Sequence, residues 1–524
     1  MKNKYIIYII LYYLFNLSYG IQQVSGQTLD SETCAKCDAL ATLRIKSIDL
    51  LSSVVVPEDG DMPEYCRVLG YVLPAIHFEI RLPTKNWNGK FYMVGCGGFC
   101  GEVNSDMTGA FMSINQALKR GYAVSAMDGG HWGESGLDAR WAYNNRLAEI
   151  DWAYRAVHET ARVTKEVIEA FYGHKPEKSY FSGCSTGGRM AVMEAYRYPG
   201  DFDGIISGAP VIDNTGLYIH MAWVAQANIG ADGNDIISST DLKLIIEAVY
   251  EACDEIDGLK DGLIDNPPEC EFDPASLLCG ENESEGCLTT EQVKTLKAWY
   301  EGPKNSAGEQ LYPGGLPLGS EPFWDFWITG HKQTAYDGII TMIASEFFRY
   351  VAYQEDPGES YGITDFNFDH DPQRLEFMAD IINSDNPNLE EFRSRNGKML
   401  MFHGWADADV TPLKTIKYYE AVEQNIGSRE ATQEFFRLFM IPGMDHCGIG
   451  VSKCPGITDD GIDPLTAIEK WVEHDEAPES LLTTKYDGDG NVLWTRPVYP
   501  YPQRVIYKGT GDVNKASSYE SNKQ

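Results

Sequence analysis

The pentapeptide Gly183-Cys184-Ser185-Thr186-Gly187 carries the clearest chemical signal in the chain. It fits the pattern Gly-x-Ser-x-Gly, with strand-like residues 180–182 before it and a helical run from Met190 after it. A strand, a tight turn carrying a serine and a helix make a nucleophile elbow, which exposes the serine hydroxyl. The N–H of Thr186 is then aimed at a developing oxyanion. Because this motif also occurs by chance, the other members of a catalytic triad have to follow downstream.

An acid and a histidine do follow Ser185. A strand predicted at Lys398–Phe402 leads into a loop with Asp407, and Asp409 is the alternative acid in that loop. The last predicted core strand ends shortly before His446. A serine hydroxyl is a poor nucleophile until a base removes its proton, and the acid holds that base in the correct tautomer. The order Ser185, Asp407, His446 is that of the α/β-hydrolases.

A glycine-rich stretch follows the predicted strand Lys90–Val94 and includes Gly97 and Gly98. In α/β-hydrolases a backbone loop in this place supplies the second oxyanion donor. The glycines would otherwise only punctuate a loop. We predict that Thr186 and either Gly97 or Gly98 form the oxyanion hole.

Alternating strands and helices surround these motifs. A helix is predicted from Cys34 to Ile48, one strand over 71–83, and further strands at 122–127 and 204–208. Such alternation implies a mainly parallel sheet. Between residues 213 and 396 the pattern changes to helices, loops and aromatic clusters, and strands resume at Lys398. We therefore predict an α/β-hydrolase core in two parts, residues 27–212 and 397–524, with an inserted lid domain at 213–396.

The N-terminus and the charge limit where the protein acts. Lys2 and Lys4 precede an apolar run and then small residues, which predicts a signal peptide over residues 1–26 and a secreted or periplasmic protein. An uncleaved anchor is the alternative, and no later stretch is long enough to span a membrane. The net charge of −34 over 524 residues argues against nucleic acid or an anionic membrane as a partner. One glycosylation sequon begins at Asn282.

Twelve cysteines in an exported chain indicate disulfides rather than metal ligands. Cys184 is next to Ser185 and Cys447 is next to His446, so an assembled triad would bring the two cysteines close. A bond between them would tie the nucleophile loop to the base loop across the whole insertion. Other cysteines in the insertion could close two local loops, namely Cys253 with Cys270 and Cys279 with Cys287. The sequence leaves six cysteines without assigned partners: Cys34, Cys37, Cys66, Cys96, Cys100 and Cys454.

An acidic loop in the insertion, residues 253–265, alternates aspartates with glycine turns. Carboxylates and main-chain carbonyls are hard oxygen ligands, which suit Ca²⁺ better than a softer metal. The loop lacks the twelfth-position glutamate of an EF-hand. A solvated acidic loop without metal is the alternative.

The motifs together resemble a known family. Gly-Cys-Ser-Thr-Gly-Gly at 183–188, Asp407 after His403-Gly404, and His446-Cys447 are similar to the signature of the tannase and feruloyl esterase family, which includes mono(2-hydroxyethyl) terephthalate hydrolase. The resemblance implies an α/β-hydrolase with a lid over the substrate, a Cys184–Cys447 disulfide and further disulfides Cys253–Cys270 and Cys279–Cys287. It also implies a structural Ca²⁺ held by Asp254, Asp257, Leu259, Asp261 and Leu263, the leucines through their carbonyls. The chain departs from the family at Tyr499, where a cysteine is usual, and this suggests one lost disulfide.

These observations predict a secreted serine carboxylesterase acting on small or polymer-linked esters of aromatic acids. A feruloyl esterase is the first choice, a tannase the second and a terephthalate half-ester hydrolase the third. Two alternatives are a serine peptidase on the same fold and an inactive protein that binds phenolics or carbohydrate. The sequence does not indicate the oligomeric state.

Overall fold

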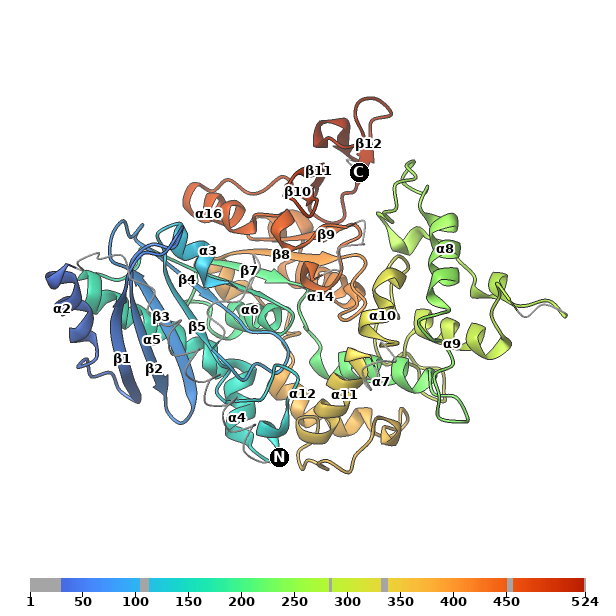
Figure 1. Cartoon of the computed structure of the whole chain (residues 1–524), viewed down its shortest axis with the longest axis horizontal. Coiled ribbons are helices and arrows are strands. Elements are labelled where there is room, and N and C mark those ends of the chain that lie inside the picture. The colour runs from blue at the N-terminus through green and yellow to red at the C-terminus, as the bar shows by residue number, and fades with distance from the viewer. Residues whose placement is uncertain (1–29, 104–112, 282–284, 331–337, 450–455, 523–524) are drawn as a thin grey trace, which may run out of the picture.

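The computed structural model describes residues 30–103, 113–281, 285–330, 338–449 and 456–522. The predicted signal peptide, Asn282 and Cys454 lie outside these ranges. A nine-stranded sheet forms the core, in the spatial order β1-β2-β3-β5-β4-β6-β7-β8-β9 (Figure 1). Its strands are β1 (Ile48–Val56), β2 (Tyr65–Val72), β3 (Ile76–Pro83), β4 (Lys90–Val94), β5 (Ala123–Met127), β6 (Lys178–Cys184), β7 (Gly204–Gly208), β8 (Lys398–Gly404) and β9 (Phe436–Ile441).

The sheet is antiparallel at one edge and parallel through the rest. β1, β2, β3 and β5 pair antiparallel in succession. From β5 through β4, β6, β7 and β8 to β9 every pair is parallel. The predicted mainly parallel α/β fold is therefore confirmed. Because parallel strands end at one edge of a sheet, the loops after β4, β6, β8 and β9 meet at that edge.

Both faces of the sheet are covered, as a parallel sheet requires. Side chains alternate along β4, where Phe91 and Met93 join one hydrophobic cluster and Tyr92 and Val94 join the other. The first cluster includes apolar residues of α2 (Ser31–Leu40), α5 (Ala156–Tyr172), α6 (Thr186–Arg197) and α14 (Pro412–Ile426). The second includes those of α3 (Ile114–Lys119) and α16 (Pro464–His474). Two short helices, α4 (Arg146–Ile150) and α15 (Arg429–Gln433), complete the core.

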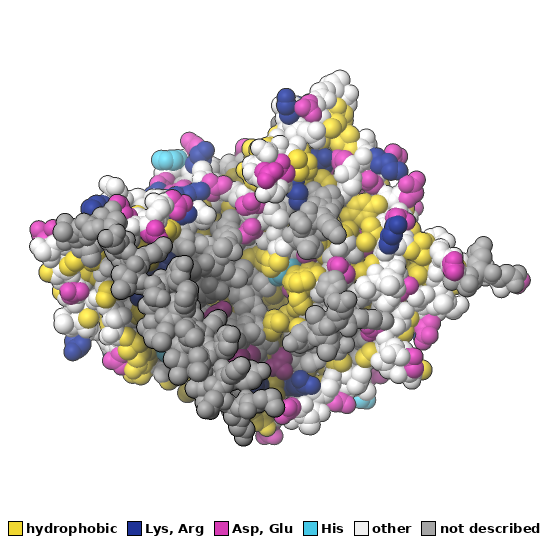
Figure 2. Space-filling view, in the orientation of Figure 1, with side chains coloured by type: hydrophobic (Ala, Val, Ile, Leu, Met, Phe, Trp, Pro, Cys, Tyr) yellow, Lys and Arg dark blue, Asp and Glu magenta, His cyan; other side chains and the backbone are white. Residues whose placement is uncertain are grey.

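The segment predicted as a lid, residues 213–396 and called the lid below, lies beside the carboxyl edge of the sheet (Figure 1). It is helical in its described part, and its inner aromatic residues, such as Trp299 and Trp324, are fully buried against one another. Its helices are α7 (Asn214–Ala227), α8 (Leu242–Cys253), α9 (Thr290–Glu301), α10 (Trp324–Trp327), α11 (Ile339–Tyr350), α12 (Glu376–Ile382) and α13 (Glu390–Ser394). Figure 2 shows hydrophobic side chains gathered where the lid meets the core, with acidic side chains scattered around the edge of this face.

Two local predictions were wrong. The helix predicted over Cys34–Ile48 ends at Leu40, and Ile48 instead begins β1, whose β-branched valines 54–56 suit a strand that pairs with β2. The single strand predicted over 71–83 is a hairpin, with β2 ending at Val72 and β3 starting at Ile76. Pro74 lies between them and has no N–H to continue a ladder.

The C-terminal tail forms two small antiparallel sheets that the periodicity did not predict. The first pairs β10 (Leu481–Tyr486) with β11 (Val492–Val498), and the second pairs β12 (Val505–Tyr507) with β13 (Tyr519–Ser521). Within the described residues, no helix is long and apolar enough to cross a membrane.

Candidate active site

Ser185 occupies the sharp turn between β6 and α6. Its backbone has φ 62° and ψ −125°, a strained conformation for a residue with a side chain. The turn is possible because a Cβ on Gly183 would lie 2.5 Å from the carbonyl carbon of Gly187. The Ser185 N–H donates to the carbonyl of Gly208 at 3.1 Å, and the side chain is partly exposed. This is the geometry of a nucleophile elbow.

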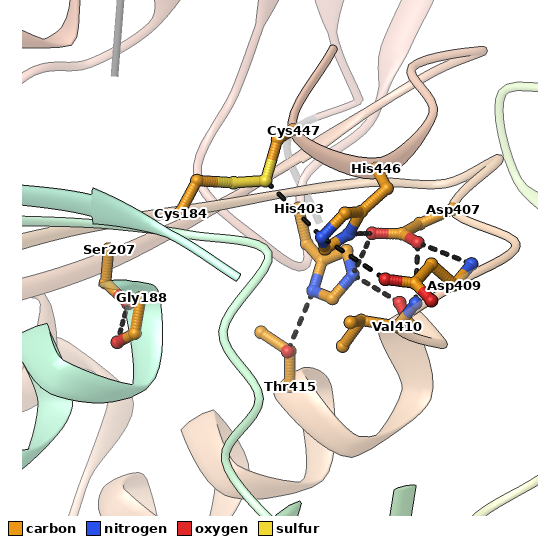
Figure 3. The surroundings of a disulfide bond; sticks show 10 residues. All are labelled: Cys184, Gly188, Ser207, His403, Asp407, Asp409, Val410, Thr415, His446 and Cys447. Atoms are coloured by element: carbon orange, nitrogen blue, oxygen red, sulfur yellow. Dashed lines mark hydrogen bonds and ion pairs between the residues drawn. A yellow bond between two sulfur atoms is a disulfide. The ribbon is translucent and has the colours of Figure 1, made fainter. Parts of the chain in front are cut away.

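Asp407 and His446 meet at the ends of β8 and β9 (Figure 3). His446 Nδ1 lies 2.8 Å from Asp407 Oδ2, and both side chains are buried. The other carboxylate oxygen of Asp407 accepts the main-chain N–H groups of Asp409 at 3.0 Å and Val410 at 2.7 Å. The acid is thus fixed by its own loop, and Nδ1 of His446 carries the proton that it donates to Asp407.

A second histidine supports the same carboxylate. His403 Nε2 lies 3.1 Å from Asp407 Oδ2 and 2.7 Å from the carbonyl of Val410. His403 Nδ1 lies 2.8 Å from the hydroxyl of Thr415. Since Nε2 faces two acceptors, it carries the proton, and Nδ1 accepts from Thr415. The sequence identified His403 only as part of a motif, and the signal for this role was its position at the end of the strand that leads into the loop of Asp407.

Asp409 faces the other side of the His446 ring. Its Oδ2 lies 3.4 Å from His446 Nε2, and Cys447 Sγ lies 3.6 Å from the same nitrogen. Among the hydrogen bonds of the described residues, none joins Ser185 Oγ to His446 Nε2. Catalytic hydrogen bonds of this kind often form only when substrate is bound. The structure thus places Asp407 on Nδ1 and the alternative acid, Asp409, near Nε2.

The charges at this edge shift one another's protonation. Burial alone would lower the pKa of His446, but the carboxylates of Asp407 and Asp409 outweigh burial and raise it to about 9. Burial would raise the pKa of Asp407, yet His446 and the hydrogen bond from His403 bring it to about 2. Burial raises the pKa of Asp409 to about 6 and that of Asp445 to about 7. Perturbed values clustered in one place are typical of a functional site.

A disulfide joins the nucleophile loop to the base loop. Cys184 and Cys447 are bonded with their Cα atoms 5.9 Å apart, although 263 positions separate them in sequence (Figure 3). The lid contains the two bonds implied by the resemblance, Cys253–Cys270 and Cys279–Cys287. The structure also pairs four cysteines that the sequence left unassigned, as Cys37–Cys66 and Cys96–Cys100. Cys34 is free in the described part of the chain.

The Cys96–Cys100 bond closes the loop that contains Gly97 and Gly98. The Thr186 hydroxyl donates to the carbonyl of Gly98 at 2.7 Å, which ties this loop to the nucleophile helix. Gly98 has φ +55°, and a Cβ there would lie 2.2 Å from the carbonyl oxygen of Gly136. The loop is therefore held close to Ser185, where its N–H groups can serve an oxyanion.

His131 supports the same loop from behind. Its Nε2 lies 2.7 Å from the carbonyl of Phe99, and its ring stacks on Trp141 with centroids 3.5 Å apart. Burial lowers the pKa of His131 to about 4, so the ring is neutral and Nε2–H donates. Nothing local in the sequence indicates that His131 contacts Phe99.

The lid reaches the site through Trp327. Its Nε1 donates to Asp445 Oδ2 at 2.8 Å, and its ring stands edge-on to His446 with centroids 5.6 Å apart. Asp445 is the residue before His446, so a lid side chain is bonded to the loop that carries the predicted base. The aromatic cluster was predicted, but the particular contact with Asp445 was not.

The acidic loop of the lid keeps its carboxylates close to its own backbone. Asp254 Oδ1 accepts the N–H of Gly262 at 2.8 Å, Asp257 Oδ1 that of Leu259 at 2.9 Å, and Asp261 Oδ1 that of Leu263 at 3.2 Å. Burial raises the pKa of Asp254 and of Asp257, and the charge of Asp261 adds to both shifts.

Among the described residues, no three His, Cys, Asp or Glu side chains are grouped to hold a metal by themselves. A metal ion in this loop would therefore need main-chain carbonyls as ligands as well. The donor set is all oxygen, it is crowded with negative charge, and Arg496 is ion-paired to Asp261. This chemistry fits a hard divalent cation.

Comparison with known proteins gives a consistent result. A family model described as "Tannase and feruloyl esterase" matches residues 62–522. An uncharacterized esterase of Xanthomonas campestris is 35% identical, over 93% of this chain and 91% of the relative. Mono(2-hydroxyethyl) terephthalate hydrolase of Piscinibacter sakaiensis is 32% identical, over 87% and 85%. The crystal structure of feruloyl esterase B from Aspergillus oryzae matches with a TM-score of 0.82 at 26% identity, covering 93% of this chain and all of that one.

Proposed function

The chain belongs to the tannase and feruloyl esterase family and is a carboxylic ester hydrolase, and from this premise we propose a serine mechanism at Ser185. The observation that carries the proposal is the contact between His446 and Asp407. The Cys184–Cys447 disulfide ties the loop of His446 to the serine elbow. Family membership sets aside the alternatives of a serine peptidase and an inactive binding protein.

In the proposed reaction Ser185 Oγ attacks the ester carbonyl while its proton passes to His446 Nε2. The new oxyanion is held by the N–H of Thr186 and that of Gly97 or Gly98, each worth roughly 3 kcal/mol. As the tetrahedral intermediate collapses, Nε2–H gives its proton to the alcohol, which leaves. Water then attacks the acyl-enzyme with His446 as base, and the free acid and Ser185 are released.

The acyl group is proposed to be aromatic and uncharged. Trp327 places an aromatic ring beside His446, which suits a flat acyl group. Asp407, Asp409 and Asp445 all lie at this edge of the sheet, and such a concentration of carboxylates disfavours an anionic acyl group. We therefore rank a hydroxycinnamate ester first, a gallate ester second and a terephthalate half-ester third.

We also propose a structural Ca²⁺ in the lid loop. The carboxylates of Asp254, Asp257 and Asp261 and the carbonyls of Leu259 and Leu263 would hold it, and it would relieve repulsion among the three acids. Secretion is proposed as well, supported by five disulfides among the described residues, which form in an oxidising compartment.

The deciding experiment measures hydrolysis of methyl ferulate, methyl gallate and mono(2-hydroxyethyl) terephthalate by the wild type and by Ser185→Ala. We expect turnover of ferulate or gallate, falling by about 10⁴-fold or more in the variant. Retained activity in Ser185→Ala would contradict the serine mechanism. Preferred turnover of the terephthalate ester would overturn the ranking of the acyl groups while leaving the mechanism in place.

A further inference from the structure

His446 lies between two carboxylates, and the proposed mechanism uses only one of them. Asp407 Oδ2 is 2.8 Å from Nδ1, while Asp409 Oδ2 is 3.4 Å from Nε2, on the reacting side of the ring (Figure 3). Both acids come from the loop between β8 and α14, two positions apart. A role for Asp409 at this nitrogen rests on the proposed function, because it concerns His446 as the base for Ser185.

Asp409 lacks the partners that fix the other acids. It is 6% exposed, and its Oδ1 is buried without a hydrogen-bond partner among the described residues. Asp407 Oδ1, by contrast, accepts two main-chain N–H groups. The carboxylate of Asp445 accepts from Trp327 Nε1 at 2.8 Å and from the main-chain N–H of Ala408 at 3.5 Å. A buried carboxylate without donors is costly, and the imidazolium of His446 is the charge that can compensate it.

We propose that Asp409 is a second acid partner of His446, the catalytic base. In the resting enzyme Asp409 accepts a hydrogen bond from Nε2–H of the His446 imidazolium. It thereby sets the pH above which His446 can accept the Ser185 proton. The reacting nitrogen then has two alternative partners, Asp409 at rest and Ser185 when an ester is bound. This explains why Nε2 lies near Asp409 here and forms no hydrogen bond with Ser185 Oγ in the described structure.

The groups around the pair agree with this assignment. From the strands and their loops, His403 and Asp407 face the Nδ1 side, and Asp445 adds negative charge from the residue before His446. From the lid, Trp327 contacts His446 edge-on, and the phenol of Tyr218 on α7 experiences the charge of Asp409. Together the carboxylates raise the pKa of His446 to about 9, and burial raises that of Asp409 to about 6. Between these values the charged pair is the resting state.

The proton balance of the reaction is unchanged. Ser185 Oγ–H still passes its proton to Nε2, and Nε2–H still passes it to the departing alcohol. Asp409 accepts a hydrogen bond from Nε2–H but never takes the proton. Because Asp409 stabilises the imidazolium, the neutral imidazole of His446 forms only at higher pH. Once formed, that imidazole is a stronger base toward the Ser185 proton.

The test is the pH dependence of kcat/KM for Asp409→Asn, which removes the charge and keeps the size. Two esters are used, p-nitrophenyl acetate, which has no ring hydroxyl on its acyl group, and methyl ferulate. We expect the acid limb, the rise of kcat/KM with pH as His446 loses its proton, to move to lower pH by about one unit or more with both esters. The reason is that an adjacent anion favours the charged imidazolium by that amount, and the variant lacks this anion. The plateau at high pH should fall.

Asp445→Asn is the matched control, since it removes the charge of a buried carboxylate at the same edge, whose oxygens accept from Trp327 Nε1 and from the main-chain N–H of Ala408 instead of facing Nε2. Its acid limb should move less than that of Asp409→Asn. An unchanged limb in Asp409→Asn, with activity lowered equally at every pH, would overturn the proposal. A loss seen only as a higher KM for ferulate would also overturn it and make Asp409 a substrate contact.

A second measurement does not depend on a folded variant. The His446 ring of the wild type, followed by NMR during a pH titration, should hold its proton well above the ordinary histidine range, and titration at or below about pH 6.5 would overturn the proposal. Failure of the proposed function is distinguishable, because it shows as activity retained by Ser185→Ala whatever Asp409 does.

Discussion

Two regions of this protein are rich in aspartates and lie beside disulfides, yet their carboxylates have different partners. At the catalytic edge Asp407 and Asp409 face the two nitrogens of one histidine. In the lid loop Asp254 and Asp257 accept main-chain N–H groups and face other carboxylates. The first arrangement can move a proton, and the second is the cation site proposed above.

The cross-links differ in the same way. The Cys184–Cys447 bond spans 263 positions and joins two strands' loops across the whole lid. The Cys279–Cys287 bond spans 8 positions and closes one local loop. The disulfide at the catalytic edge is thus long-range, whereas this disulfide of the lid is local. A change that breaks one region should therefore leave the other largely intact.

The largest expected effect is on the catalytic edge. In Asp407→Asn the amide holds His446 in the wrong tautomer, so kcat should fall by about 10⁴-fold with little change in the unfolding midpoint. Asp254→Asn in the lid loop is the contrasting variant, and it should lower the midpoint while reducing kcat far less. Steady-state kinetics and urea denaturation check both. Comparable losses of kcat in the two variants would refute the division between the loops.

The disulfides test the difference in span. Replacing both Cys184 and Cys447 by alanine should lower the free energy of unfolding by about 5 kcal/mol, because the bond restricts a very long loop in the unfolded chain. Replacing Cys279 and Cys287 should cost about half as much by the same argument. Urea unfolding of the two double variants measures this directly. Equal losses would show that loop length does not govern the stabilisation.

Removal of calcium should act on the lid alone. A chelator is expected to lower the free energy of unfolding by about 3 kcal/mol relative to protein with calcium at about 100 times its Kd. The position of the acid limb of kcat/KM should not move, since no calcium ligand lies at the catalytic edge. Asp261→Asn should abolish the response to added calcium. A chelator that leaves the unfolding midpoint unchanged would exclude a structural ion.

Local patterns predicted the parallel strands and the motif-bearing loops, because short buried strands followed by glycine or acidic loops are visible in sequence. The same patterns failed at the β2–β3 hairpin, where Pro74 interrupts one apparent strand. They also missed the tail sheets, whose strands carry no clear periodic signal.

At the site, the residues of the predicted triad were identified by order and motif, while their support was not. The contacts of His403 with Asp407, of Asp409 with His446 and of His131 with Phe99 depend on side-chain directions that no spacing records. The bond Cys96–Cys100 was likewise undecided, since six cysteines allow many pairings.

The smallest expected effect concerns the hydrogen bonds that hold Asp407 in place. The variant tests whether these bonds matter for catalysis or only for the stability of the fold. The Thr415 hydroxyl donates to Nδ1 of His403, so Nε2–H of that ring is directed at Asp407 and Val410. Thr415→Val removes this donor and leaves a buried ring nitrogen without a partner, which should cost about 1 kcal/mol of unfolding free energy. Because the His403 ring then loses one of the contacts that orient it toward Asp407, kcat should fall by about fivefold, which corresponds to a similar loss of free energy at the transition state.

Thr432→Val is the matched control for that change. Thr432 is also fully buried, and its hydroxyl donates to the carbonyl of Ser428 at 2.9 Å, remote from the triad in the hydrogen-bond network. It should lose similar stability and keep its kcat, whereas only Thr415→Val should lose both. If the two variants showed the same kcat, the hydrogen bond of His403 to Asp407 would matter for packing alone. If they differ, the catalytic edge depends on a chain of donors that begins on α14, outside the triad.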